Sequence, residues 1–167
     1  ATLAGLMVGS TSLAGERPPA RAPGEVRLAV SGLCALGDRG LPAVHDINLD
    51  VRSGEIVGIA GVAGNGQREL AQVLAGLRSA TDGTVDLGGK DVTTDPPRRR
   101  FGSGLCYIPE DRLGVGLAPR LSVVENAVLR SYAQHRRGPF LLEASMTAHC
   151  QDLVDRFGVR TGPLGDP

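Results

Sequence analysis

The sequence predicts an α/β fold organised around a phosphate-binding loop, and three consecutive segments support this. The short apolar run Glu55–Ala60 is typical of a strand buried on both faces of a parallel sheet. It leads directly into the glycine-rich turn Gly61–Gly66. Apolar residues then recur at helical spacing, at Leu70, Val73, Leu74 and Leu77, and Gly76 lies near the end of the predicted helix. Strand, glycine-rich loop and helix in this order form the unit that binds phosphate in many proteins.

Further strands are predicted on both sides of this unit. Apolar residues alternate over residues 26–30 and again over residues 47–51, which predicts two strands of one sheet. Gly88-Gly89 separates two short segments, Thr84–Leu87 and Asp91-Val92, and so predicts a tight hairpin. The run Leu105–Ile108 predicts another buried strand, which ends at Pro109.

Two helices are predicted in the C-terminal third. Ser122 and Glu125 have the spacing of a capping box, in which the hydroxyl accepts from the third amide and the carboxylate from the first. A helix is therefore expected to begin near Ser122. The amphipathic stretch Met146–Phe157 predicts a second helix that ends at Gly158.

Composition narrows the class of protein. The chain has 167 residues, enough for one hydrophobic core, and 41% hydrophobic with 22% charged residues is typical of a globular domain. The formal net charge is zero, so no nucleic-acid partner is predicted. The three cysteines are far apart, which favours neither a disulfide framework nor a zinc site and fits a reducing cytoplasm. The run Arg98-Arg99-Arg100 is predicted to be a solvated surface.

The glycine-rich turn departs from the standard phosphate-loop pattern at two positions. Glycines let successive backbone N–H groups converge on a phosphate, and the helix dipole adds positive potential. The pattern continues with a lysine for the β- and γ-phosphates and a Ser/Thr for magnesium, but Gln67 and Arg68 stand there. The alternative is an ordinary glycine-rich turn between strand and helix. A dinucleotide fingerprint is not supported, because its third glycine would fall at Glu69.

Several segments together resemble one family, the ATP-binding subunits of bacterial ABC importers for ribose-like sugars and nucleosides. These subunits carry two fused nucleotide-binding domains. The resemblance extends from about Glu25 to the C-terminus and rests on residues 54–66 with the helix that follows, Tyr107–Arg112 and Gly116–Asn126. The second domain of such subunits typically lacks the Walker A lysine and has Glu-Asp-Arg where the first domain has its glutamine loop, as this chain does at Glu110–Arg112.

The resemblance implies a fold, a domain arrangement and a set of site residues. The fold is a phosphate-loop NTPase core of ABC type, with a mixed sheet, flanking helices, antiparallel edge strands and the start of a helical subdomain. Residues 1–24 correspond to the tail of a preceding nucleotide-binding domain and a linker, and residues 25–167 to the N-terminal part of a second one. Glu110 takes the glutamine-loop position, and no catalytic or metal-binding residue is assigned. The nucleotide-binding residues are Gly61, Val62, Ala63, Gly64, Asn65, Gly66, Gln67 and Arg68.

The resemblance also implies ligands and partners. They are ATP with Mg²⁺, the other nucleotide-binding domain of the same polypeptide, and membrane permease subunits, at the cytoplasmic face of the plasma (inner) membrane as a peripheral protein. The signature helix, Walker B aspartate, catalytic glutamate and switch histidine are expected to follow Pro167, so the chain is not expected to hydrolyse ATP alone. The aromatic residue that usually stacks on adenine has no counterpart, since residues 25–66 contain no Phe, Tyr or Trp.

Three functional hypotheses follow from the altered loop. The first is a regulatory half of an import ATPase that binds nucleotide with little hydrolysis. At position 67 the carboxamide of glutamine replaces the ammonium of the standard lysine, and this replacement is expected to weaken nucleotide binding about ten-fold. Arg68 could turn inward and restore the charge, or it could lie outward on the helix surface. The outward position is favoured. The second is a hydrolysing phosphate-loop enzyme such as a kinase, which would need the lysine. The third is an interaction domain that has lost nucleotide.

Overall fold

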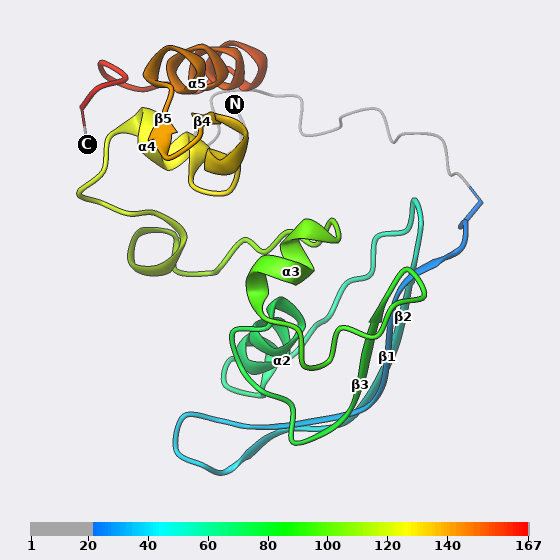
Figure 1. Ribbon diagram of the computed structural model, residues 1–167. Coiled ribbons are helices and arrows are strands. Elements are labelled where there is room, and N and C mark those ends of the chain that lie inside the picture. The colour runs from blue at the N-terminus through cyan, green and yellow to red at the C-terminus, as the bar shows by residue number, and fades with distance from the viewer. Residues whose placement is uncertain (1–21, 167) are drawn as a thin grey trace, which may run out of the picture. The chain divides into compact units, whose positions relative to one another are not determined.

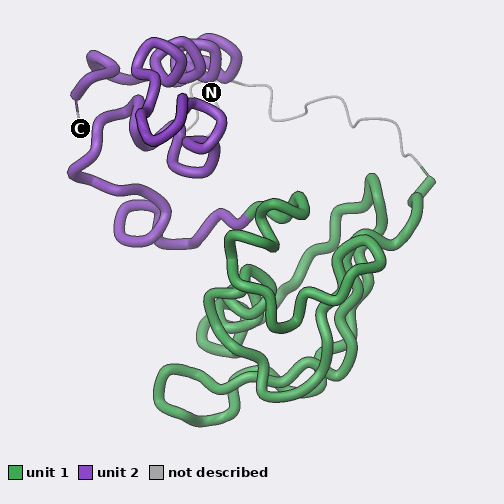
Figure 2. The backbone as a smooth tube through the Cα atoms, in the orientation of Figure 1, with its two compact units in different colours: residues 1–106 green, residues 107–167 purple. Residues whose placement is uncertain are grey.

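The computed structural model describes residues 22–166 and divides the chain into two compact units, with the boundary between Cys106 and Tyr107 (Figure 2). Each unit has its own cluster of buried apolar residues, so the prediction of one core is wrong. The reason is that two separate apolar surfaces are buried. One is a face of the sheet in the first unit, and the other lies between two helices of the second unit. The predicted tail and linker, residues 1–24, lie almost entirely outside the described residues.

The first unit contains a three-stranded antiparallel sheet in the order β2-β1-β3 (Figure 1). Its strands are β1 (Val26–Leu36), β2 (Pro42–Arg52) and β3 (Asp82–Leu87). The two strands predicted from alternating apolar residues are thus confirmed and pair with each other. The hairpin at Gly88-Gly89 is also confirmed, since the Val92 N–H donates to the Val85 carbonyl at 2.8 Å.

Helix α2 (Gln67–Ala75) packs against this sheet. Leu70 and Val73 are buried with sheet residues Val30, Leu33, Val44 and Val85. Gly76 adopts a left-handed conformation with φ of 76° and ends the helix, because only glycine takes this geometry without strain. Leu77 was predicted on the helix but lies beyond it and is 53% exposed. A short helix, α3 (Pro97–Gly102), follows the hairpin.

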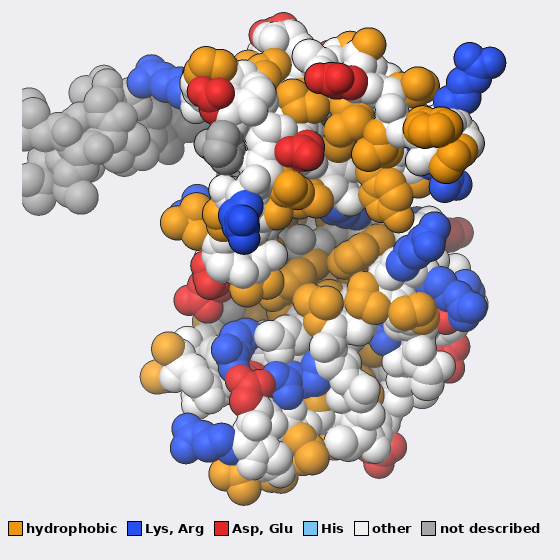
Figure 3. Space-filling model, turned by 60° about the vertical axis from the view of Figure 1, so that its left-hand side comes forward, with side chains coloured by type: hydrophobic (Ala, Val, Ile, Leu, Met, Phe, Trp, Pro, Cys, Tyr) orange, Lys and Arg blue, Asp and Glu red, His pale blue; other side chains and the backbone are white. Residues whose placement is uncertain are grey.

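Two predicted buried strands do not form within the described residues. Residues 55–60 and 105–108 belong to no strand, and Ile56 and Ile108 are 98% and 85% exposed. A strand exists only when a neighbouring strand pairs with its backbone N–H and C=O groups. Neither segment has such a partner here, so both predictions are corrected. Hydrophobic side chains are accordingly visible on the surface of the molecule (Figure 3).

The second unit is built around helices α4 (Val123–Val128) and α5 (Glu143–Phe157) (Figure 1). A π-helical turn (Arg112–Gly116) precedes them, and a 3-10 turn (Tyr132–Gln134) and the short strands β4 (Arg136–Arg137) and β5 (Phe140–Leu141) lie between them. The helices bury Val124, Val128, Met146 and Cys150 together. The second predicted helix is confirmed at its end, Gly158, but begins three residues before Met146. No described helix is long and apolar enough to cross a bilayer.

The capping box predicted at Ser122 is present. The Ser122 hydroxyl accepts from the Glu125 N–H at 3.2 Å, and the Glu125 carboxylate accepts from the Ser122 N–H at 2.8 Å. Asn126 adds hydrogen bonds to the Ala118 backbone N–H and carbonyl, at 2.9 and 3.0 Å. The start of α4 is therefore fastened to the loop that precedes it.

We expect Ser122→Ala to loosen α4. Loss of an N-cap hydroxyl costs about 1 kcal/mol, which corresponds to about five-fold faster hydrogen exchange of the α4 amides in the full-length protein. Ser79→Ala, an exposed serine in the other unit, is the control and should leave that exchange unchanged. Equal protection of α4 in both variants would show that the capping box does not stabilise this helix.

Acid should act on the same cap. Hydrogen bonds from the Ser122 N–H and hydroxyl lower the pKa of Glu125 below the usual range of a glutamate. A depressed pKa stabilises the folded state above the unfolded pKa, and this contribution is lost as the pH falls through the folded value. Protection of α4, corrected for intrinsic exchange, should therefore fall in wild type as the pH drops below the usual pKa range of a glutamate, and it should change less in Glu125→Gln.

Candidate functional site

The turn Gly61–Gly66 leads into the N-terminus of α2 as the sequence predicts. Gly64 and Gly66 have φ of 92° and 91°, which other residues adopt only with strain. Gly66 is the N-cap of α2, and its carbonyl accepts from the Leu70 N–H at 2.8 Å. The first N–H groups of a helix have no intrahelical partner and point towards the loop before it. A glycine-rich loop followed by a helix N-terminus is an arrangement that stabilises anions in many proteins.

The loop is fixed to the sheet at Gly66. This residue is buried, and a Cβ at position 66 would overlap the carbonyl of Ala43 on β2. The backbone of the loop thus approaches β2 more closely than any residue with a side chain allows. Glycine at this position is required both by conformation and by space.

Gln67 folds back over the loop. Its side-chain amide donates to the Val62 carbonyl at 3.3 Å, and a Cβ at position 61 would overlap the same amide nitrogen. The carboxamide therefore lies against Gly61 and Val62 of the turn. It is an uncharged donor at the position where the standard pattern has an ammonium group.

Arg68 points away from the loop, as favoured from the sequence. Its guanidinium pairs with Asp38 at 2.5 Å and with Glu69 at 3.1 Å, and its side chain is 54% exposed. Asp38, in the turn between β1 and β2, also pairs with Arg78. Hydrogen bonds from the Arg78 and Arg68 guanidinium groups lower the pKa of Asp38 below its ordinary value. Arg68 is thus committed to surface ion pairs and does not restore the missing charge.

A cavity of about 290 Å³ lies between the loop and the sheet. Its lining is mostly apolar and comes from β2, from the segment before the loop and from α2. The lining residues are Ala43, Val44, His45, Ile47, Ile59, Ala60, Gly61, Asn65, Gly66, Gln67 and Leu70. The lining contains the imidazole of His45 but no Phe, Tyr or Trp side chain.

Glu110 lies in the second unit, in a loop. Its side chain is exposed. The next residue, Asp111, accepts from the Gly114 N–H at 2.8 Å and caps the π-helical turn that follows. A Cβ at Gly114 would overlap the Asp111 carboxylate, so the turn is closed tightly.

Sequence reasoning missed two features of the first unit. The ion pairs of Asp38 with Arg68 and with Arg78 could not be predicted from the sequence, because Asp38 lies 30 residues from Arg68 and 40 residues from Arg78. The burial of Arg100 was also missed, and that residue contradicts the prediction of a solvated arginine run. Among residues 22–166, no cluster of three or more His, Cys, Asp or Glu side chains has the arrangement of a metal site.

Comparison with known proteins places this geometry in context. Residues 44–162 match the family model described as ABC transporter. The chain is 42% identical over 162 residues to the Glucose import ATP-binding protein TsgD13 of Haloferax volcanii, covering 96% of this chain and 30% of that protein. It is 38% identical over 161 residues to the Guanosine import ATP-binding protein NupO of Bacillus subtilis, covering 95% and 32%. The chain thus spans about a third of the length of these relatives.

The fold is also similar to solved structures. A bacterial Atm1-family ABC exporter with ATP bound superposes with a TM-score of 0.58 at 19% identity, covering 92% of this chain and 25% of that chain. At this identity the likeness concerns the fold alone. It agrees with the mixed α/β fold with antiparallel strands and a phosphate loop that the sequence predicts.

Proposed function

Because the chain belongs to the ABC transporter family, as an ATP-binding domain related to the ATPases of sugar and nucleoside importers, we propose that it forms part of the ATP-binding component that powers import of a sugar or nucleoside. The observation that carries the proposal is the glycine loop at the N-terminus of α2, packed on β2 through Gly66. The names of the relatives, which refer to glucose and guanosine import, support this substrate class.

The proposed nucleotide site consists of Gly61 to Gly66 with Gln67 and Arg68. Positions 61 and 66 require glycine, because side chains there would collide with Gln67 and Ala43. Backbone N–H groups and the dipole of α2 would hold the phosphate oxygens, and the Gln67 amide would add a neutral donor.

Magnesium fits this loop less well. In the standard pattern a Ser/Thr hydroxyl binds the ion, whereas the Arg68 side chain carries no oxygen and is paired with Asp38 and Glu69. Neither Gln67 nor Arg68 supplies what hydrolysis requires at these two positions. We therefore propose that this half of the ATPase binds nucleotide with little hydrolysis and serves a regulatory role.

One observation favours a second function. The Gln67 amide already takes up space beside the loop, where it lies against Gly61 and donates to the Val62 carbonyl. A loop filled by its own side chain also suits an interaction domain that has lost nucleotide. The two functions differ in a single measurable property, nucleotide affinity.

The proposed partners are the other nucleotide-binding domain of the same polypeptide and membrane permease subunits, at the cytoplasmic face of the plasma membrane. The proposed domain arrangement assigns residues 1–24 to a preceding domain and linker and residues 25–167 to a second nucleotide-binding domain.

Titration of the full-length protein with a fluorescent ATP analogue tests the proposal. Its other nucleotide-binding site must first be disabled by substitution of that site's Walker A lysine, so that the signal reports this loop. Saturable binding that ATP competes away supports the ATP-binding function. An absence of binding to this site favours the interaction domain.

We expect changes in the loop after Glu110 to impair solute uptake while nucleotide affinity stays nearly unchanged. Glu110→Lys reverses an exposed charge, and Gly114→Pro removes the N–H that donates to Asp111. Under the proposed function this loop transmits the nucleotide state to the permease, so uptake should fall several-fold. Uptake in cells and analogue binding are measured on the same variants.

Asp155→Lys serves as the control for charge reversal, since Asp155 is an exposed residue of α5 in the same unit. Its uptake should equal that of wild type. Normal uptake in both loop variants would instead identify the segment as an ordinary surface loop.

A further inference from the structure

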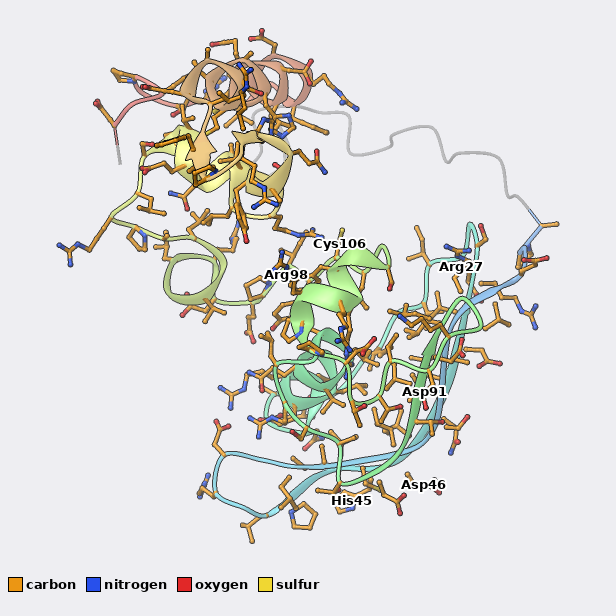
Figure 4. The ribbon with its side chains drawn as sticks, in the orientation of Figure 1. Arg27, His45, Asp46, Asp91, Arg98 and Cys106 are labelled. Atoms are coloured by element: carbon orange, nitrogen blue, oxygen red, sulfur yellow. The ribbon has the colours of Figure 1, made fainter. Side chains whose placement is uncertain are left out.

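Arg100 is a buried arginine within a run that is otherwise solvated. It lies on α3 and is only 2% exposed, whereas its neighbours Arg98 and Arg99 are exposed (Figure 4 labels Arg98). Burial of a guanidinium is costly unless its N–H groups are satisfied. Burial also lowers the pKa of Arg100, against the opposing charges of Asp95 and Asp91. The hydrogen-bond partners of the Arg100 guanidinium therefore decide what this buried side chain stabilises.

The Arg100 side chain donates four hydrogen bonds to backbone carbonyls. Nη1 donates to Val73 at 2.6 Å and to Leu74 at 3.0 Å. Nη2 donates to Thr93 at 2.7 Å, and Nε donates to Asp95 at 2.9 Å. The planar fork of arginine is the only side chain that can serve four acceptors in this way.

Two of these carbonyls belong to the last turn of α2. Carbonyl groups in the last turn of a helix carry the negative end of the dipole, so a cation there is stabilising. The Val73 carbonyl also accepts from the Gly76 N–H at 3.0 Å, so Arg100 adds a second donor to it. The contact is close, since a Cβ at Gly76 would lie 2.9 Å from Arg100 Nε. Arg100 therefore joins the C-terminal end of α2 to the segment 93–95 and to α3.

Helix α2 is thus held at both ends. Its N-terminus is fixed where Gly66 packs on Ala43, and its C-terminus is fixed by Arg100. A helix of nine residues moves as a rigid body, so a tilt at one end displaces the other. The position of Gln67 and of the first helical N–H groups consequently depends on the bonds at Val73 and Leu74.

We propose that Arg100 is a positioning residue of the nucleotide site, which sets the orientation of α2 and through it the geometry of the loop Gly61–Gly66. The inference rests on the proposed ATP-binding function. Arg100 lies at the far end of α2 and would act on the nucleotide only through this helix.

The test compares Arg100→Met, Arg100→Lys and the control Arg98→Met in the full-length protein whose other nucleotide site is disabled. Affinity for the fluorescent ATP analogue is measured at a temperature where thermal unfolding shows every variant to be folded. Arg100→Met should weaken binding about ten-fold, within the range that substitutions remote from a ligand produce. Arg100→Lys, whose ammonium reaches fewer carbonyls, should fall between Arg100→Met and wild type, and Arg98→Met should equal wild type.

A purely structural role gives a different result. Arg100→Met would then lower the melting temperature and leave the affinity of the folded protein unchanged, which overturns the proposal. If Arg100→Met does not fold, the proposal is overturned when Arg100→Lys binds the analogue with the affinity of wild type.

Hydrogen exchange separates this inference from the proposed function. If wild type does not bind the analogue, the ATP-binding function fails. Exchange of the Leu70 amide, which donates to the Gly66 carbonyl, still reports how firmly the start of α2 stays hydrogen-bonded to the loop. Faster exchange at Leu70 in Arg100→Met than in Arg98→Met supports positioning by Arg100. Equal exchange in the two variants refutes it.

Discussion

Gly66→Ala is expected to weaken nucleotide binding by about thirty-fold or more. A non-glycine residue in the left-handed region costs roughly 1–2 kcal/mol, and the new Cβ would also overlap the Ala43 carbonyl. The loop of this variant relieves both by moving away from β2, and its return to the geometry that binds phosphate costs about 2 kcal/mol or more, which corresponds to about thirty-fold in affinity. The measurement is titration of the full-length protein, with its other site disabled, with the fluorescent ATP analogue.

Two alanine variants isolate the overlap from the strain. Gly54 has φ of 76° and Gly64 has φ of 92°, and a Cβ at either position would meet no atom within 4 Å. Gly54→Ala introduces the backbone strain of a positive φ at a position outside the loop, so its affinity for the nucleotide should equal that of wild type. Gly64→Ala carries it within the loop and should lose less affinity than Gly66→Ala. Equal affinity in Gly66→Ala and Gly54→Ala would mean that the loop does not hold the phosphates.

Gln67→Lys is expected to tighten binding about ten-fold. A charge-assisted hydrogen bond contributes roughly 1.5–3 kcal/mol, about twice a neutral bond, so an ammonium beside a polyphosphate gains about 1.4 kcal/mol over the carboxamide. Arg68 does not supply this charge already, because it is paired with Asp38 and Glu69. Analogue titration at low and high salt measures the gain, which screening should reduce.

Gln134→Lys is the matched control. It introduces the same charge at an exposed position of the second unit. Its affinity should remain that of wild type. An unchanged affinity in Gln67→Lys as well would count against phosphate binding by this loop and for an interaction domain without nucleotide.

The sequence by itself determined the features that depend on neighbours close along the chain. The capping box of Ser122 and Glu125 involves residues three positions apart, and it forms as predicted. Gly76 and Gly158 end their helices because glycine alone adopts the left-handed conformation freely. The glycine loop and helix α2 follow the same local rules, and so the candidate site could be located without coordinates.

Tertiary structure decided the features that depend on distant partners. The apolar runs at residues 55–60 and 105–108 have the composition of buried strands, yet no described strand pairs with them, and pairing is not encoded in a run itself. Arg100 looks like Arg98 and Arg99 in sequence, but only its position on α3 faces the carbonyl groups that end α2. The missing positive charge at the loop has the same kind of cause. The Arg68 guanidinium pairs with Asp38, a residue 30 positions away, and is therefore not available to the loop. Hydrogen bonds and ion pairs form where the fold brings groups within reach, and spacing along the chain carries little information about such contacts.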